Sequence, residues 1–403
     1  MFEFLFNLTI EQVVMINVIL IAINLLSSVF IKKRVKTKYN KTQSVEEALY
    51  LQQKLSKYIQ ILLLVITSFI SALTITPHTD SMGKLGIFVV MGVCFINMIV
   101  ILIGSQLILY KTNQFLRKTT ATRKEQIGML IRFLIFSIIP MMIMFTVIIM
   151  KPDNFNIDER FEKYIHILIP AAVYLLITFI MPFFYKYMFK AEHLNDLELH
   201  DNLLSFVRMA GINRVKMFLW PTKNNRHANA LVAGLIRKDI YVSDYLLENF
   251  TLEETQSILA HEIGHIKKHH LWIRTGLILG FIIIFPLLGE AMEMYEEQFS
   301  EISIWVGLLI FLSIFVLYFI VLRHYISRVQ ERQADTFVLD IGVEPLVYIS
   351  ALYKLAKLNN VVFKFGKLDE KFQTHPSIVK RIRWMMEQGN ISEDEIEFIL
   401  TVE

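Results

Sequence analysis

The stretch His261-Glu262-Ile263-Gly264-His265 decides how this 403-residue chain is interpreted. In a helix, residues four apart share a face, so the imidazoles of His261 and His265 can bind one metal ion. Zinc held in this way lowers the pKa of a bound water toward about 7, and Glu262 can act as the general base beside that water. The stretch therefore predicts a catalytic site for peptide hydrolysis with one Zn²⁺ per chain.

The residues before this stretch predict the helix that it needs. Thr251 and Glu254 have the spacing of a capping box, in which a hydroxyl and a carboxylate bind free amides at a helix start. The alternative is a solvated helix whose polar residues match the pattern by chance. Apolar residues at helical spacing continue through the motif: Leu252, Ile258, Leu259, Ile263 and Ile266.

A catalytic zinc usually takes three protein ligands, so a third must come from elsewhere in the chain. Glu331 is the best candidate, on a stretch without a helix breaker. Asp335, one turn later, can accept a hydrogen bond from the free ring nitrogen of a ligating histidine. The same charged cluster is also typical of a solvated helix face. His269 and His270 are competing ligands, but on a continuous helix they lie about two turns beyond His261, too far for a shared ion. They are expected to be interfacial groups or groups that support a ligand.

Four groups of residues in this chain form a combined pattern. They are His261 to His265 with His270; Ser327, Arg328, Glu331, Ala334 and Asp335; Thr374 to Ser377 with Arg381; and His227 to Ala230 with Gly234. Together they resemble the zinc-dependent membrane endopeptidases that include the type I CAAX prenyl proteases, and by motif the resemblance covers roughly residues 180–385.

This resemblance implies roles for the metal side of the site. Glu331 is implied as the third metal ligand and Asp335 as the residue that holds a ligating histidine from behind. His375 is implied as a catalytic group near the scissile carbonyl, where it stabilises the oxyanion.

The resemblance also implies how substrate binds. Asn229 and Ala230 are implied on an edge strand that pairs with an extended peptide, with Arg381 as a further substrate-binding residue. The prenyl-protease branch commonly has aromatic residues after the strand asparagine, where this chain has Leu231-Val232-Ala233. This departure argues against a specificity for prenylated substrates, although not against proteolysis.

The composition is that of a membrane protein, because 54% of the residues are hydrophobic and only 19% are charged. The predicted fold is mainly α-helical and polytopic, with a gluzincin-type zinc-metallopeptidase domain that contains a small β-sheet. Apolar stretches near the roughly 20 residues needed to cross a bilayer predict seven spans, at residues 10–31, 58–77, 85–110, 131–150, 164–185, 272–292 and 302–322.

Basic residues in the loops after the first and third spans predict the topology, since the positive-inside rule makes such loops cytoplasmic. Alternation then puts the N-terminus outside and the catalytic domain and C-terminus in the cytoplasm. The N-terminal segment lacks a basic run, so the first span is expected to persist as an anchor. The basic residues are Lys32, Lys33, Arg34, Lys36, Lys38, Lys41, Lys111, Arg117, Lys118, Arg123 and Lys124.

Charge beside spans is typical of topology or of contact with anionic lipid, so the expected partners are the bilayer and a peptide or protein substrate, without nucleic acid. The substrate is expected to include membrane-associated or lipidated proteins. The membrane is expected to be a bacterial cell membrane, or the endoplasmic reticulum membrane if the chain is eukaryotic.

The chain is predicted to consist of four segments. They are a five-span membrane region at 1–190, the first half of the catalytic domain with the metal helix at 191–271, a two-span hairpin at 272–323, and the second half with the third ligand at 324–403. Short β-rich runs predict a small sheet from residues 215–220, 229–236 and 239–242. Further helices are predicted at 193–208, 347–358, 378–386 and 394–401.

The function that these patterns favour is an integral-membrane zinc metalloendopeptidase. Within that class, membrane-protein quality control and signal-peptide processing compete with prenyl-tail processing. A second class is a signalling receptor whose zinc domain cuts a cytosolic repressor, but such receptors usually add an extracellular domain and the outside loops here are short. A catalytically silent scaffold is disfavoured by the intact base and ligands.

Overall fold

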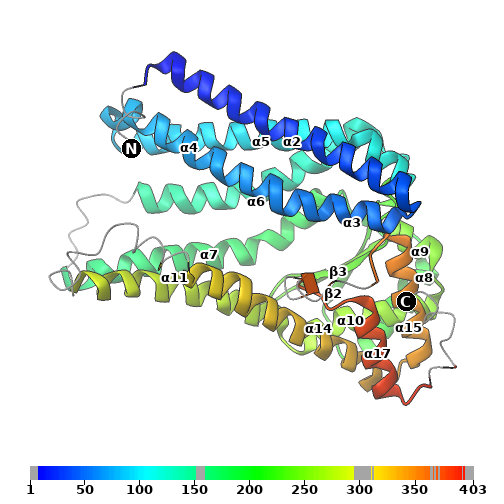
Figure 1. The fold of residues 1–403 in the computed structure, drawn as a ribbon. Coiled ribbons are helices and arrows are strands. Elements are labelled where there is room, and N and C mark those ends of the chain that lie inside the picture. The colour runs from blue at the N-terminus through cyan, green and yellow to red at the C-terminus, as the bar shows by residue number, and fades with distance from the viewer. Residues whose placement is uncertain are drawn as a thin grey trace. The chain divides into compact units, whose positions relative to one another are not determined.

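The computed structural model describes residues 8–150, 159–294, 313–363 and 373–392, together with residues 310, 366, 369, 370 and 394. It divides into two compact units. The first unit is Met1–Ile135 with Asn224–Arg226, and the second is Phe136–Lys223 with His227–Glu403. Helices dominate both units (Figure 1).

Long helices that pack along one another build the first unit. The chain enters α2 through a capping box in which Thr9 and Gln12 bind each other's backbone amides, and Ser44 caps the next helix. A π-helical turn joins α3 to α4, and a 3-10 turn ends α4. The elements are α2 (Ile10–Thr42), α3 (Val45–Leu55), η1 (Ser56–Gln60), α4 (Ile61–Thr79), η2 (Asp80–Met82), α5 (Lys84–Arg117) and α6 (Arg123–Ile149), which ends in the second unit.

Buried polar side chains bridge α2, α4 and α5. The Asn17 Oδ1 atom accepts hydrogen bonds of 2.6 Å from both Ser71 and Asn97. Asn24 donates to Thr67 Oγ1 over 2.8 Å. Between helices in an apolar medium such bonds stabilise association by roughly 0.6 kcal/mol each. These polar groups therefore fix the register of three apolar helices.

Six described helices are long and apolar enough to cross a membrane, so this is a multi-pass membrane protein. They are Ile10–Thr42, Val45–Met82, Lys84–Arg117, Arg123–Val147, Ile167–Phe189 and His270–Leu288. Of the seventh predicted span, 302–322, residues 302–309, 311 and 312 lie outside the described residues. The expectation that the basic residues lie in loops is wrong for most of them. Because no Pro or Gly interrupts the chain there, α2 and α5 continue as helices through Thr42 and Arg117.

The second unit contains α7 (Glu159–Phe189), which packs beside α11 (His270–Met294), and a four-stranded sheet. The strands are β1 (Glu192–His193), β2 (Val215–Trp220), β3 (Ala230–Ala233) and β4 (Lys238–Ser243). Their order is β1-β2-β4-β3, with β4 parallel to β2 and antiparallel to β3. The predicted small sheet is confirmed, and β3 is one of its edges.

A tight turn joins β3 to β4 and depends on Gly234. Its φ is +101°, and a Cβ there would lie 1.9 Å from the carbonyl oxygen of Arg237. Lys238 closes the turn by donating from Nζ to the carbonyl oxygens of Gly234 and Leu235. Only glycine suits this position, so the turn sets the end of the edge strand.

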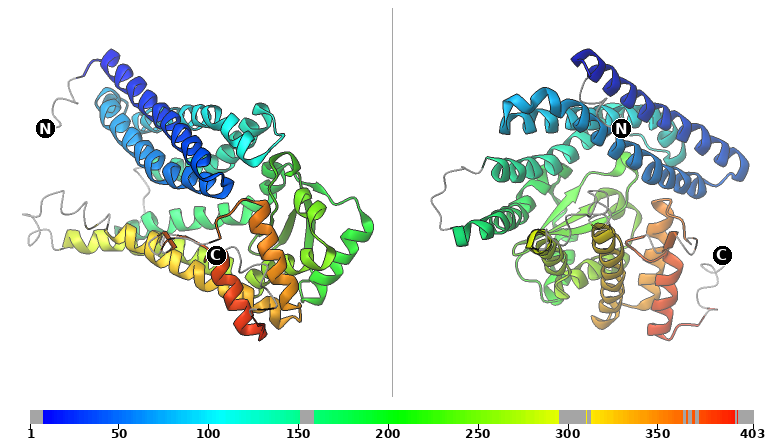
Figure 2. Two further views of the ribbon diagram at one scale, coloured as in Figure 1. Left: turned by 45° about the vertical axis from the view of Figure 1, so that its right-hand side comes forward. Right: turned by 60° about the vertical axis from the view of Figure 1, so that its left-hand side comes forward.

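Helix α10 (Leu252–Lys267) lies at the centre of the second unit (Figure 2). Leu259 and Ile263 pack with Ile240 of the sheet, and Ala260 packs with Ile349 of a helix on the other side. Complete burial of such side chains contributes about 1.5–3 kcal/mol each. The surrounding helices are α8 (Leu197–Met209), α9 (Asp244–Asn249), α14 (Arg323–Asp340), α15 (Pro345–Leu358) and α17 (Ile378–Gly389), with the π-helical turn η4 (Leu317–Leu322) before α14.

Three of the predicted helices of this unit are confirmed with shifted bounds. The helix expected at 193–208 begins at Leu197, because Asp196 caps it by accepting from the Leu199 amide and because residues 192–193 pair with β2 instead. The helices expected at 347–358 and 378–386 are α15 and α17. The helix expected at 394–401 lies outside the described residues except for residue 394.

Candidate active site

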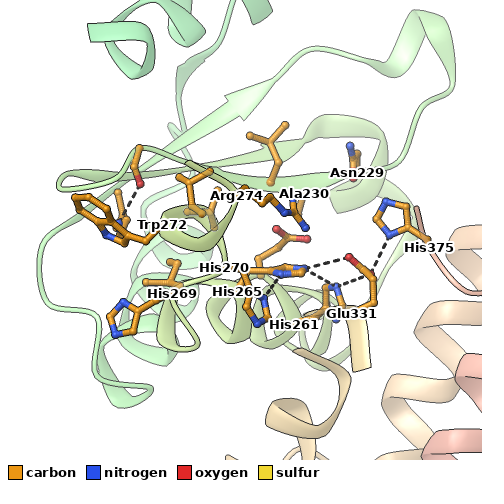
Figure 3. A pocket seen from close by; sticks show the side chains of 17 residues that line it. Asn229, Ala230, His261, His265, His269, His270, Trp272, Arg274, Glu331 and His375 are labelled. Carbon is orange, nitrogen blue, oxygen red and sulfur yellow. Dashed lines mark hydrogen bonds and ion pairs between the residues drawn. The ribbon is translucent and has the colours of Figure 1, made fainter. Parts of the chain in front are cut away.

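The helix that carries the motif begins as predicted. Thr251 Oγ1 accepts from the Glu254 amide over 3.2 Å, and Glu254 Oε2 accepts from the Thr251 amide over 2.9 Å. The helix then runs without interruption to Lys267 and presents His261, Glu262 and His265 to one cavity. Figure 3 shows the two imidazoles facing the carboxylate of Glu331.

Helix α14 reaches this site because α10 has a glycine where the two helices cross. A Cβ on Gly264 would lie 3.0 Å from the Cα of Ala334 and 3.1 Å from its carbonyl oxygen. Ala334 itself is fully buried with a one-carbon side chain. The small residues of both motifs thus allow a close crossing, which carries Glu331, one turn before Ala334, to the imidazoles.

Side-chain nitrogens and oxygens of three residues meet at distances that suit one small cation. The Nε2 atoms of His261 and His265 are 3.2 Å apart. Glu331 places Oε2 at 3.5 Å from the first and Oε1 at 3.5 Å from the second. Bonds of roughly 2.0–2.1 Å to a tetrahedral zinc give ligand pairs about 3.3 Å apart, so the group fits this ion.

The burial and ionisation of Glu331 give a second test of whether these residues fit a zinc ion. The residue is 1% exposed, and imidazole nitrogens of His261, His265 and His375 lie 2.9 to 3.5 Å from its carboxylate oxygens. Burial of a carboxylate is costly unless positive charge compensates it, and a bound cation would supply that charge. Burial alone raises the pKa of Glu331, but the nearby imidazoles of His261 and His375 hold it well below its usual range. The carboxylate is therefore ionised, as a metal ligand must be.

A buried cluster holds His261 from behind. Its Nδ1 atom lies 2.9 Å from Asp335 Oδ1 and 3.0 Å from the hydroxyl of Tyr348. Tyr348 donates to Asp335 over 2.7 Å, and Arg381 donates to both oxygens of Asp335 over 2.6 and 3.0 Å. This arrangement directs Nδ1–H of His261 at Asp335 and leaves Nε2 for a cation.

The charges of this cluster favour positive charge at His261. Burial alone lowers the pKa of His261, but Asp335 and Glu331 raise it to about 9. Burial also raises the pKa of Asp335, but Arg381 and His261 hold it below its usual range. In contrast, burial and the neighbouring His261 lower the pKa of His265 to about 2, so this imidazole is neutral.

His265 has its own support, and the expectation that residues 261–270 form one continuous helix is wrong. Helix α10 ends at Lys267, and His269 adopts a left-handed conformation with a φ of 55°. The chain therefore turns back, and His270 Nδ1 lies 2.7 Å from His265 Nδ1. His270 is 1% exposed and its Nε2 atom lies 2.9 Å from Gln333 Oε1. It is thus a partner of a ligand, outside the three-ligand group.

Glu262 lies on the cavity side of the metal-binding group. The cavity of about 320 Å³ is lined by Glu262, the three ligand residues and the edge strand. Burial raises the pKa of Glu262 to about 7, against the opposing effect of His261. A carboxylate with a pKa near neutrality can both take a proton from water and release it to a leaving group.

The substrate-binding residues implied by the resemblance are only partly found in this cavity. Asn229, Ala230 and His375 line it, and the His375 side chain is 62% exposed with its Nδ1 atom 2.9 Å from Glu331. Arg381 is not among the lining residues described, because its guanidinium is bound to Asp335 and Tyr348.

Comparison with known proteins agrees with the motifs. The model of peptidase family M48 matches residues 193–388. The "CAAX prenyl protease 1 homolog" of Dictyostelium discoideum is 28% identical over 230 residues, which cover 53% of this chain and 53% of that protein. The "Protease HtpX homolog" of Caldanaerobacter subterraneus subsp. tengcongensis is 27% identical over 213 residues, which cover 46% of this chain and 70% of that protein. The chain thus spans about half the length of the Dictyostelium relative.

A solved structure shows the same fold. The crystal structure of S. mikatae Ste24p matches with a TM-score of 0.64 at 19% identity, covering 94% of this chain and 100% of that chain. Residues 193–388 therefore resemble a peptidase family M48 domain, in a multi-pass membrane protein that is similar to the type I CAAX prenyl proteases.

Proposed function

We propose that this protein is an integral-membrane zinc endopeptidase. The observation that supports it most directly is one cavity in which His261, His265 and Glu331 converge at 3.2 to 3.5 Å beside Glu262. Zinc bound by these three residues would polarise the peptide carbonyl and activate a water. The chain's own residues then carry out the proton transfers and hold the peptide.

In this proposal the edge strand binds the substrate. The outer side of β3 faces the cavity, and an extended peptide pairs with Ala230 and Val232 by strand addition. Glu262 accepts a proton from the attacking water and passes it to the leaving amine. Asn229 and His375 lie at the same cavity and donate hydrogen bonds to the peptide and to the developing oxyanion.

Replacement of Glu262 by Gln tests this proposal. The change removes the base but none of the three metal ligands, so cleavage of a fluorogenic peptide should fall by at least about 100-fold, the upper range for general base catalysis being about 10⁴-fold. Zinc should still co-purify at one per chain, measured by elemental analysis. Undiminished turnover of the Glu262→Gln protein would disprove the assigned chemistry.

The natural substrate class is a narrower proposal. We infer that unmodified peptides are cleaved at least as well as prenylated ones, because Leu231-Val232-Ala233 replaces the expected aromatic residues beside the cavity. This favours quality control or peptide processing. The test compares one peptide with its prenylated twin, and a strong preference for the prenylated form would reverse the inference.

We also propose that the catalytic segments 191–271 and 324–403 lie in the cytoplasm, joined by the two-span hairpin 272–323, with the N-terminus outside. The basic side chains on α2 and α5 support this orientation. Single cysteines introduced at residues 2 and 390 into a Cys94→Ser chain should differ in labelling by an impermeant thiol reagent. Labelling of residue 390 but not residue 2 in intact cells would reverse the orientation.

A further inference from the structure

Two cationic side chains line the cavity beside the metal-binding group, and hydrolysis as proposed uses neither. Lys238 is bound to carbonyl oxygens of the turn after β3, so its ammonium group is already occupied. The other cation is Arg274, one turn after His270 on α11. Arg274 is therefore the cavity cation available to a ligand.

Contacts from α14 hold the guanidinium of Arg274 in place. Its Nε atom donates to Gln330 Oε1 over 2.8 Å, and Gln330 is 2% exposed. Gln330 in turn donates from Nε2 to the carbonyl oxygen of His270 over 3.4 Å. The two terminal nitrogens of Arg274 have no acceptor among the described residues, and Figure 3 shows the side chain reaching into the cavity.

The charges around the cavity suit an anionic ligand group. With zinc bound, the ion's two positive charges are balanced by the carboxylates of Glu262 and Glu331, and Arg274 leaves an excess of positive charge. A guanidinium with free terminal nitrogens offers parallel N–H donors that match the two oxygens of a carboxylate.

We propose that Arg274 binds a carboxylate of the substrate, either an acidic side chain near the cleaved bond or the C-terminal carboxylate of a peptide. This proposal rests on the proposed endopeptidase function and narrows its specificity. A lipid phosphate is a competing ligand, since Arg274 lies near the start of a membrane span. The anchor on Gln330 and the cavity shared with Glu262 favour the substrate.

The experiment uses the full chain with zinc and four versions of one peptide. Two versions differ by Asp or Asn beside the cleaved bond, and two by a free or amidated C-terminus. The native enzyme should prefer one carboxylate form by about 10- to 100-fold in kcat/KM, mainly through KM, as expected for a charged hydrogen bond. Which pair shows the preference identifies the source of the carboxylate.

Variants of Arg274 then test the residue itself. Arg274→Gln should abolish the preference while retaining zinc and cleavage of the uncharged peptide, and Arg274→Lys should retain part of it. Lys216→Gln, which removes an exposed cation of β2 outside the cavity, should behave like the native enzyme. Arg274→Glu should transfer the preference to a peptide with Lys at the same position.

Other results would overturn the proposal. A preference that survives Arg274→Gln, or an equal loss of zinc and of activity toward every peptide, assigns Arg274 a structural role. An effect of the variant only in vesicles of anionic lipid assigns it to the membrane. Cleavage without any preference overturns this inference alone, whereas a zinc-loaded native enzyme that cleaves none of the peptides overturns the proposed function with it.

Discussion

The imidazoles of His261 and His265 are each held in orientation at Nδ1, the ring nitrogen that does not face the proposed metal ion. The Gln333 side-chain oxygen can only accept, so it fixes the proton of His270 on Nε2. The Nδ1 atom of His270 then accepts from His265, whose Nε2 lone pair is left for the metal. Asp335 does the same for His261 with a full negative charge. His261 is thus supported by a negatively charged hydrogen-bond partner, and His265 is supported by the neutral pair of His270 and Gln333.

Loss of the neutral support of His265, which His270 and Gln333 provide, should weaken zinc binding without unfolding the domain. His270→Ala is expected to lower zinc affinity by about 10- to 100-fold, the usual effect of losing a residue behind a ligand. Titration against a chelator measures this change. His269→Asn is the matched control, because asparagine tolerates the left-handed backbone and the described hydrogen bond to His265 Nδ1 comes from His270 and not from His269. Equal affinities for the two variants would exclude this role of His270.

The carboxylates of Glu331 and Asp335 should differ in how much their replacement lowers zinc binding and activity. Glu331→Ala should lose both zinc and activity, and Glu331→Gln should keep the shape but bind zinc more weakly, because the anionic oxygens are gone. Asp335→Asn should be milder, at about 10- to 100-fold in affinity or activity. Zinc content and kcat/KM measured on the same preparations test this order, and a Glu331→Ala protein with full zinc content would contradict it.

The site residues that could be predicted from the sequence are those that belong to a recognisable motif with fixed spacing. Tyr348 was missed because it lies on a different helix from Asp335, and nothing in the sequence around it indicates a polar contact. A supporting position of His270 outside the ligand set was expected, but its contact with His265 was not predicted, because this contact depends on a left-handed residue at 269, where histidine gives no signal comparable to glycine. Both contacts exist only once the helices pack.

At the scale of elements, the crossing of α10 and α14 determines whether a site exists at all. Gly264 and Ala334 belong to different motifs, yet they contact each other, so the two motifs are one packing unit. The sequence predicts both helices because capping and apolar spacing are local. It does not predict the strand order β1-β2-β4-β3, since pairing between distant strands is not encoded in local spacing.

A larger side chain at the crossing should separate the ligands. Gly264→Val would push α14 away and is expected to reduce stability by about 1–3 kcal/mol, as overpacking does, and to lower zinc affinity. Gly276→Ala in α11 is the control, because nothing lies within 4 Å of the added carbon. Chemical denaturation and zinc titration should both distinguish the two variants. A Gly264→Val protein with native zinc affinity would show that the crossing can relax.

For the whole molecule, hydropathy was sufficient to indicate a multi-pass membrane protein, since each span must satisfy its own backbone. It could not give the helix bounds, because α2 and α5 extend beyond their apolar parts as charged helix. The three residues that could hold a metal ion come from α10 and α14, and the apolar helix α11 lies between these two helices in the sequence.

Removal of the metal should therefore loosen the second unit as well as stop catalysis. Excess chelator is expected to lower the thermal midpoint of the detergent-solubilised protein, since a ligand at 1,000 times its dissociation constant stabilises by about 4 kcal/mol. Added zinc should restore both the midpoint and the activity. The Glu331→Ala protein should show no chelator shift, and an equal shift in that variant would assign the effect to another metal.

The separation of His265 from Glu331 also has a consequence for biosynthesis. The ribosome completes α10 first, and the apolar helix α11 must then be made before Glu331 of α14. Until α14 emerges and packs against Gly264, the nascent chain holds two imidazoles and a base but no complete metal site. If the protein is the endopeptidase proposed above, the order of synthesis alone delays its activity until Glu331 has been made and α14 has packed against α10.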